Sequence, residues 1–377
     1  MPNRMKPSRM EKRLTETICR ASTQLVADCA DAELAAYWAR VGRFTEAREK
    51  IKLLRQKNEC NPKVELSVWL HFSEGLLAYF SNDGVTNADG VQRAHALSVA
   101  SGMREMRALS AAWLAQWDYA KVDVKSLTFR VQEALQNAGP ENHSCRARAA
   151  LVVAQVLHLA TRLDLAKKWY FVAKEHAIAG LDGATIGALM HNMAWQRMLV
   201  FRQVVLTNGT DINAGRHALM SAESTAHFEE MTGDASWRNL RPILRAQILS
   251  LGGDAEGALT IYGESLSLEK IPERWQANLL SDKAWCHAKL LQFDEAKSCA
   301  HFAAISLTKD TQIDDTAATH SRLSQTYCLL NKPDLAEQHR QLAQTLWNQF
   351  SEVLSEAVRL LSKIDEDGMV VVSESPS

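Results

Sequence analysis

The chain has 377 residues, of which 46% are apolar and 23% charged, and its formal net charge is −1. This composition is ordinary for a folded protein, and the near-zero charge argues against a general attraction to nucleic acid or to an anionic membrane. No apolar run approaches the roughly 18 residues of a membrane-spanning helix, and the N-terminus MPNRMKPSRMEKR lacks the hydrophobic core of a signal peptide. The seven cysteines are dispersed without a C-x-x-C pair, which is typical of free thiols in a reducing compartment. We therefore expect a cytoplasmic protein without nucleic-acid or membrane partners.

Helical patterns fill most of the chain, whereas strand patterns are nearly absent. Apolar residues recur at intervals of three and four, as in the stretch from Leu34 to Val41, and turn residues such as Gly42 and Gly253 interrupt them. This pattern predicts an all-α fold with a leading helix near residues 8–27, followed by about eight antiparallel helical pairs. The expected pairs span 30–57, 64–101, 103–138, 144–179, 183–231, 235–268, 273–308 and 314–363.

Two interruptions are expected inside these pairs. The second pair carries an insertion, SNDGVTNADG, between its helices. The fifth pair has two long helices separated at Asn208-Gly209, and Asp211 is expected to cap the second of them.

Three stretches in the C-terminal third follow one template, in which a small residue in a first helix precedes a turn and then an alanine in a second helix. The marked alanines, Ala258, Ala296 and Ala336, are 38 and 40 residues apart. Self-similarity at such a period is typical of an α-solenoid, in which stacked hairpins bury a continuous core and most often bind other molecules.

These residues resemble tetratricopeptide repeats (TPR) and their longer-helix relatives. The matching runs are Leu34-Ala35…Trp38…Gly42…Ala47, Val153-Ala154…Ala166…Tyr170…Ala173, Ala246…Gly253…Ala258…Tyr262 and Leu323-Ser324…Tyr327…Asn331…Ala336…Ala343. The resemblance covers roughly residues 28–345 with degenerate repeats, whose period is nearer ~40 than the family's ~34 residues. It implies a right-handed α-solenoid of about eight hairpins with a long C-terminal capping helix. HEAT-type repeats share this period and stay a structural alternative.

The expected organisation has three parts. Residues 1–27 form a basic arm and the leading helix, residues 28–364 the solenoid, and residues 365–377 an acidic disordered tail. The last helix should begin at Pro333, a favourable first-turn residue, and end near Lys363. Its apolar stripe caps the final hairpin or, alternatively, forms a homodimer or partner interface. The stripe comprises Leu342, Leu346, Phe350, Leu354, Val358 and Leu361.

Motifs for catalysis or phosphate binding are absent from the sequence. It contains no G-x-x-x-x-G-K-[ST], G-x-G-x-x-G, H-E-x-x-H or G-x-S-x-G. Cys286-His287 and Cys299…His301 contain metal-ligand types, but adjacent residues of a helix point about 100° apart, so buried thiols beside ordinary histidines are the better interpretation. His227-Phe228-Glu229-Glu230 is interpreted as a solvated helix end. We expect no catalytic residue, metal or cofactor.

The TPR resemblance implies a set of residues on the concave face formed by the first helices. Amides there suit an extended peptide, Arg148 and Lys289 favour an acidic segment or a C-terminal carboxylate, and the tryptophans supply apolar anchors. The full set is Arg40, Arg148, Gln155, His158, Asn192, Trp195, Gln196, Gln247, Asn278, Trp285, Lys289 and Gln325.

The sequence thus predicts a non-catalytic protein- or peptide-binding scaffold or adaptor that acts within a multiprotein complex. The alternative is an intracellular regulator, in which a bound ligand or peptide changes the closure of the solenoid and so controls an effector protein. An enzyme with a cryptic site is the third hypothesis, which no motif supports.

Overall fold

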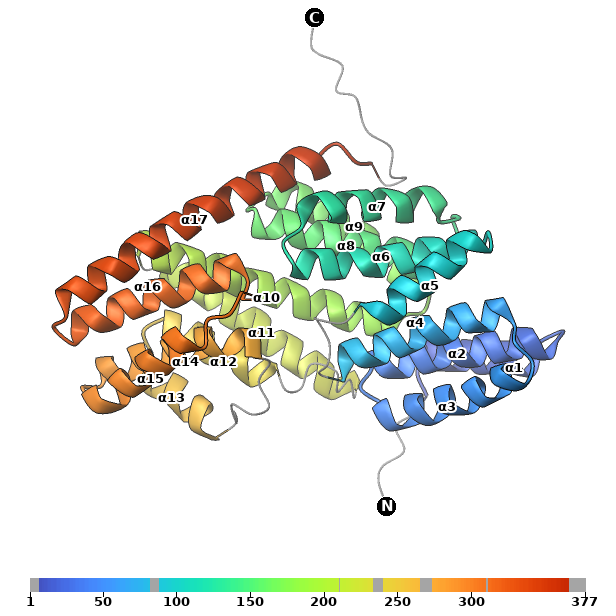
Figure 1. The fold of residues 1–377 in the computed structure, drawn as a ribbon, viewed down its shortest axis with the longest axis horizontal. Coiled ribbons are helices and arrows are strands. Elements are labelled where there is room, and N and C mark those ends of the chain that lie inside the picture. Colours follow the sequence, from blue (N-terminus) through green and yellow to red (C-terminus); the bar gives the residue numbers. More distant parts are fainter. Residues whose placement is uncertain are drawn as a thin grey trace, which may run out of the picture.

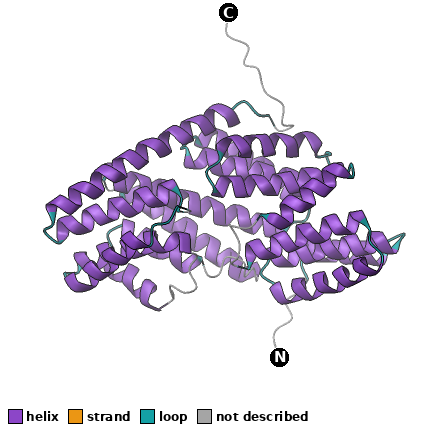
Figure 2. Cartoon of the chain, viewed as in Figure 1, coloured by secondary structure: helices purple, strands orange, loops and turns teal. Residues whose placement is uncertain are grey.

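The computed structural model describes residues 7–81, 88–209, 211–232, 240–264, 273–309 and 311–365, and in these ranges the protein is all-α, without a strand (Figure 2). The fold class predicted from the sequence is confirmed. The helices are α1 (Arg9–Cys19), α2 (Gln24–Arg40), α3 (Phe44–Cys60), α4 (Val64–Phe80), α5 (Asp89–Ala100), α6 (Arg104–Ala120), α7 (Val124–Asn137), α8 (His143–Leu159), α9 (Leu163–Ala179), α10 (Gly183–Asn208), α11 (Ile212–Thr232), α12 (Arg241–Leu251), α13 (Ala255–Glu264), α14 (Glu273–Lys289), α15 (Phe293–Ile305), α16 (Ile313–Leu329) and α17 (Pro333–Leu361).

Helices adjacent in the chain pack as pairs from α2–α3 to α16–α17, and most pairs agree with the predicted spans. The first pair begins earlier than predicted, at Gln24, and α12 begins later than predicted, at Arg241. The leading helix was predicted too long, because it ends at Cys19. Thr23 then caps a new helix, and its hydroxyl accepts a hydrogen bond from the Val26 N–H at 3.3 Å. The predicted cap at Asp211 is confirmed, since its carboxylate accepts from the Ala214 N–H at 3.0 Å.

The insertion predicted in the second pair is shorter than expected. Most of it lies outside the described residues, but Asp89 and Gly90 already belong to α5. Gly90 lies directly against Gly75 of α4, and a Cβ on either glycine would come within 2.8 Å of the other helix. The two glycines therefore allow close contact between α4 and α5, which extends the helix into the glycine-containing stretch.

Eight turns between helices share one backbone geometry. In each, a residue in the left-handed region is followed two positions later by the next helix, and the intervening N–H bonds the carbonyl five residues earlier, as Gln292 does to His287 at 2.9 Å. Glycine or asparagine occupies four of these positions, including the predicted turn residues Gly42 and Gly253. The eight residues are Gly42, Gly102, Val122, Thr161, Leu181, Gly253, Leu291 and Asn331.

The long helix α10 crosses the middle of the molecule and connects its two ends (Figure 1). It packs on α8 and α9 and also on α12 and α16. Helix α17 pairs with α16 and then runs back to α7 and α8, where Ala357, Leu361 and Ile364 join the core of these helices (Figure 1). The last hairpin therefore contacts the middle of the chain as well as its sequence neighbours.

The long C-terminal helix is confirmed, and it starts at Pro333 as predicted. Its apolar stripe faces helices of the same chain. Leu346, Phe350 and Leu354 pack with residues of α10, α12 and α16, while Val358 and Leu361 pack with the α6–α9 core. Only Leu342 of the stripe is exposed. The stripe thus has intramolecular partners, and homodimerisation through it stays a prediction.

Candidate functional site

The residues predicted for the concave face lie on first helices of the hairpins, but most are covered by other parts of the chain. Eight of the twelve are buried: Arg40, Arg148, Gln155, His158, Gln196, Gln247, Asn278 and Trp285. Asn192, Trp195 and Gln325 are partly exposed, and Lys289 is exposed. Partner binding at the buried eight stays a prediction, which requires separation of the helices that cover them. In the structure these eight side chains do not form a solvated surface.

One buried polar centre joins the first hairpin to the fifth. Arg40 of α2 donates to both carboxylate oxygens of Asp182, at 2.8 and 3.1 Å, and to the Thr185 hydroxyl at 2.7 Å. Asp182 also caps α10 by accepting from the Thr185 N–H at 3.0 Å. A bidentate arginine–carboxylate pair fixes both distance and orientation. This pair therefore ties α2 to the start of α10 across 142 residues.

Arg148 of α8 lies beside this centre without a carboxylate of its own. Its guanidinium carbon is 3.8 Å from the centroid of the Trp113 ring, and Arg40 lies over the same ring at 5.8 Å. Burial, together with the charge of Arg40, lowers the pKa of Arg148 to about 9. The arrangement places two arginines on one indole.

The other predicted residues of the middle hairpins are internally hydrogen-bonded. His158 contacts the Tyr170 hydroxyl at 3.1 Å, and burial lowers the pKa of this histidine to about 4, so it is neutral near pH 7. Gln196 donates to the Tyr119 hydroxyl at 2.8 Å. Gln155 is 3.5 Å from Gln116. These contacts connect α8 with α6 and α9, and α6 with α10.

A second charged centre connects α10 to α16. Arg202 donates to Asp315 at 2.6 Å and to Asp314 at 2.7 Å, and all three side chains are buried. Burial raises the pKa of Asp314 to about 6, and the adjacent Asp315 adds to the rise. Gln247 and Asn278 complete this centre through a 2.6 Å hydrogen bond between α12 and α14.

A third centre lies among α12, α14 and α16. Arg322, only 2% exposed, donates to Asp282 at 2.7 Å and to the Ser250 hydroxyl at 3.1 Å. Arg322 and Lys289 both lie near the Trp285 ring, with charged groups 4.3 and 5.6 Å from its centroid. The arginines and aspartates of the second and third centres were missed from the sequence. The sequence could have indicated them, because some lie on the same helical face as a residue that was predicted for the site. Asp282, for example, lies three residues before Trp285.

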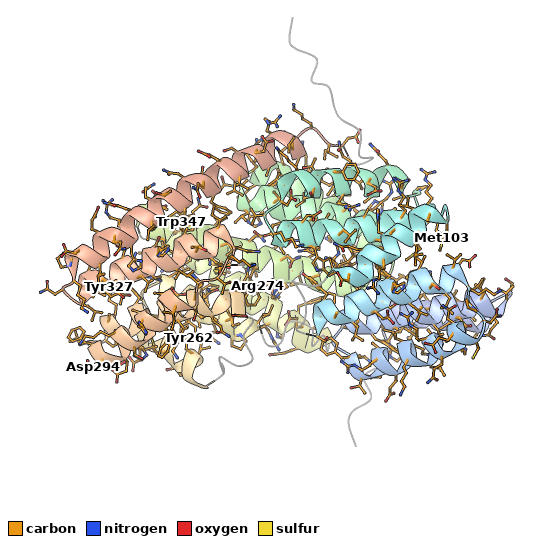
Figure 3. All side chains as sticks on the ribbon, in the orientation of Figure 1. Met103, Tyr262, Arg274, Asp294, Tyr327 and Trp347 are labelled. Atoms are coloured by element: carbon orange, nitrogen blue, oxygen red, sulfur yellow. The ribbon has the colours of Figure 1, made fainter. Side chains whose placement is uncertain are left out.

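A partly exposed aromatic cluster lies where α10 meets the start of α14. The rings of Trp195 and Trp275 are 5.5 Å apart, and His191 stacks on Trp195 at 6.1 Å. Arg274 lies over Trp275 at 4.8 Å and is near the centre of the molecule in Figure 3. Burial raises the pKa of Tyr79, whereas the charges of Arg148 and Arg274 oppose this rise, so Tyr79 lies within electrostatic range of both arginines. We call Trp195, Trp275 and Arg274 the α10–α14 cluster.

The structure also places the two sequence segments that contain metal-ligand residue types, one around His287 and the other around Glu229. His287 contacts Gln292 at 2.6 Å, and no group of three or more metal-ligating side chains occurs in the described part of the chain. The prediction of a solvated end at Glu229 is wrong. Glu229 is 1% exposed and pairs with Arg241 of α12 at 3.1 Å, because α11 packs against α12.

Comparison of the chain with protein-family models gives no match, and comparison with curated proteins gives no significantly similar sequence. The TPR resemblance therefore stays a prediction from the residues of this chain. Among the helices in the described ranges, none has the length and apolar character to cross a membrane.

Proposed function

We propose that the protein is a non-catalytic scaffold or adaptor of the TPR-like solenoid kind, which binds a partner protein at the α10–α14 cluster. The repeated turn geometry and the buried alanines Ala258, Ala296 and Ala336 support the solenoid arrangement. The observation that carries the binding proposal is the partly exposed pair of Trp195 and Trp275 beside Arg274.

The chemistry of the cluster suits an interface. Tryptophan and arginine are enriched among the residues that dominate binding energy, because each combines a large contact area with a directional donor. Asn192 lies three residues before Trp195 on the same helix and is also partly exposed, so it adds an amide next to the aromatic surface. The cluster thus offers apolar anchor area together with hydrogen-bonding groups.

The positive charge of Arg274 indicates which kind of partner residue the cluster would bind. No described carboxylate lies within 4.0 Å of Arg274, and its Nε has no hydrogen-bond acceptor. An acidic side chain of a partner would supply the missing acceptor while an apolar residue covers the indoles. We therefore favour a partner segment that carries an acidic residue next to an aromatic or aliphatic one.

The test is affinity capture of partners by the full-length chain, followed by quantitative comparison of variants. We expect Trp195→Ala combined with Trp275→Ala to lower binding of the captured partner at least 30-fold, since two anchors at about 1–2 kcal/mol each are removed. Phe171→Ala is the matched control, because Phe171 is 62% exposed on α9 and takes part in none of the ring contacts of the cluster. Unchanged binding by the double variant, with loss in the Phe171 variant, would place the interface on the outer helices and refute the proposal.

A further inference from the structure

The guanidinium of Arg148 is a buried positive charge that no described carboxylate contacts, although Asp182 lies within electrostatic range of it. The side chain is 5% exposed, no described carboxylate oxygen lies within 4.0 Å of it, and its Nε lacks a hydrogen-bond acceptor. The Trp113 ring at 3.8 Å compensates the charge only in part, because an aromatic face offers a quadrupole and no acceptor atom. Buried charges in folded proteins are normally paired and hydrogen-bonded. The site therefore has one anionic acceptor too few.

The surrounding charges are paired with one another. Arg40 binds Asp182 at 2.8 Å, and Arg13 binds Glu33 at 3.1 Å. With Arg148 these groups make three positive and two negative charges when both carboxyls are ionised. Burial raises the pKa of Glu33, and its protonation would increase the positive surplus. While Glu33 is ionised, a ligand with a single negative charge balances the site.

A cavity opens directly at Arg148, among α2, α4, α6, α8 and α10. Its volume is about 30 Å³, which is room for only one or two water-sized groups. Its other polar lining residues are Glu33, Tyr37, Arg40, Ser144 and Thr185, and the remaining walls are apolar and aromatic. Ser144 is in the first turn of α8, four residues before Arg148, so the positive end of the helix dipole adds to the local potential.

This combination of size, charge and shape defines the ligand class. The planar fork of a guanidinium matches a carboxylate, which can accept two parallel hydrogen bonds. While Glu33 is ionised, a dianion such as sulfate would exceed the surplus of one positive charge, and an amino acid or nucleotide would exceed the volume. Formate, the smallest carboxylate, satisfies both limits.

We propose that the cavity binds one small carboxylate of formate size, which Arg148 holds through its guanidinium while the cation also lies over the Trp113 ring. The bound anion lies between α8 and the walls contributed by α2 and α10. Its binding therefore stabilises the packing of the N-terminal helices around the cavity. The site is separate from the α10–α14 cluster, and neither proposal depends on the other.

The test uses the full-length chain without a partner, so its outcome is independent of the proposed protein binding. Thermal unfolding is followed by circular dichroism while sodium formate replaces sodium chloride at constant ionic strength. We expect a saturable rise in Tm of about 3 °C, together with saturable quenching of tryptophan fluorescence. Direct binding is measured by line broadening of ¹³C-formate in NMR.

Arg148→Gln removes the cation and should abolish the rise in Tm, the quenching and the line broadening. This variant is expected to fold, because it removes an unbalanced buried charge, and Arg148→Met provides a second variant with an apolar side chain of similar length. Arg197→Gln is the matched control: it removes an exposed arginine of α10 that does not line the cavity, and it should keep the full response to formate.

A competition experiment with peptides tests whether the carboxylate comes from a free small molecule or from the end of a peptide chain. Acetyl-trialanine with a free C-terminus and its amidated form are each added in competition with ¹³C-formate. Failure of both peptides to compete supports a free small carboxylate, whereas competition by the free-acid form alone keeps the carboxylate site and assigns it to a chain end. The proposal is overturned if wild type shows no saturable response, or if Arg148→Gln and Arg148→Met respond to formate as wild type does.

Discussion

Replacement of Arg202 by methionine tests the buried charge network most sharply. Arg202 is 3% exposed and donates to Asp314 and Asp315 at 2.7 and 2.6 Å. Arg202→Met keeps an apolar stem of similar length but leaves two buried carboxylates next to each other. Removal of one partner from a buried ion pair costs about 3–5 kcal/mol. We expect the free energy of unfolding at pH 7.5 to fall by that amount.

Asp314→Asn changes the same centre, but we expect it not to lower the free energy of unfolding at pH 7.5. Burial raises the pKa of Asp314 from 3.8 to about 6, so the folded protein binds this proton more tightly than the unfolded chain does. The stability contributed by the protonated form is fully present below pH 3.8 and is lost as the pH rises towards 6. The difference corresponds to about 3 kcal/mol. Asp314→Asn should therefore be at least as stable as wild type at pH 7.5, and it should lack the decline between pH 4 and 6.

Urea unfolding at pH 5.0 and pH 7.5, followed by circular dichroism, measures these differences. The cost of Arg202→Met should be smaller at pH 5.0, because the Asp314 carboxylate can then take up a proton. Arg197→Met on the same helix is the control: Arg197 is exposed, and its replacement should change stability by less than about 0.5 kcal/mol. The reasoning is refuted if Arg202→Met costs no more than Arg197→Met, or if its cost is the same at both pH values.

Two further predictions concern the backbone. Leu291 is 74% exposed and has a φ of 60°, so Leu291→Gly should raise the free energy of unfolding by about 0.5–1 kcal/mol. Leu290→Gly, one residue earlier and outside the left-handed region, should lower the free energy of unfolding. Equal effects of the two substitutions in chemical denaturation would contradict this account of the turns. Gly75→Ala should destabilise by about 1–3 kcal/mol, because its Cβ would lie 2.6 Å from Val91 Cγ2. Gly263→Ala meets no atom within 4 Å and should stabilise α13 by about 0.5–1 kcal/mol, so a loss of stability there would count against the packing argument.

The helical hairpins could be predicted from sequence because their signals are local. Apolar spacing of three and four marks each helix, and Gly42 and Gly253 mark two of the turns. The turns at Thr161 and Leu291 have the same geometry without glycine, so their residues carry no local signal. The early end of the leading helix was missed because one threonine cap at Thr23 outweighs a continuing helical pattern.

The placement of the candidate site was predicted less completely. The repeat register put Arg40, Asn278 and Trp285 on first helices, as the structure has them. The repeat register did not show that these helix faces are covered by other helices of the chain. Such coverage depends on contacts between residues that are far apart in the sequence. Asp182 lies 142 residues after Arg40, and no local pattern at either position identifies the other. Trp275 was missed for a related reason, since its significance depends on contact with Trp195 of another hairpin.

Hydrogen exchange measured by mass spectrometry, with and without a captured partner, tests the proposed binding surface most directly. Our account predicts slower exchange on binding in α10 and at the start of α14, around Trp195 and Trp275, and little change in α9, where Phe171 is exposed. Slower exchange confined to α9 or the other outer helices, with α10 and α14 unchanged, would contradict it.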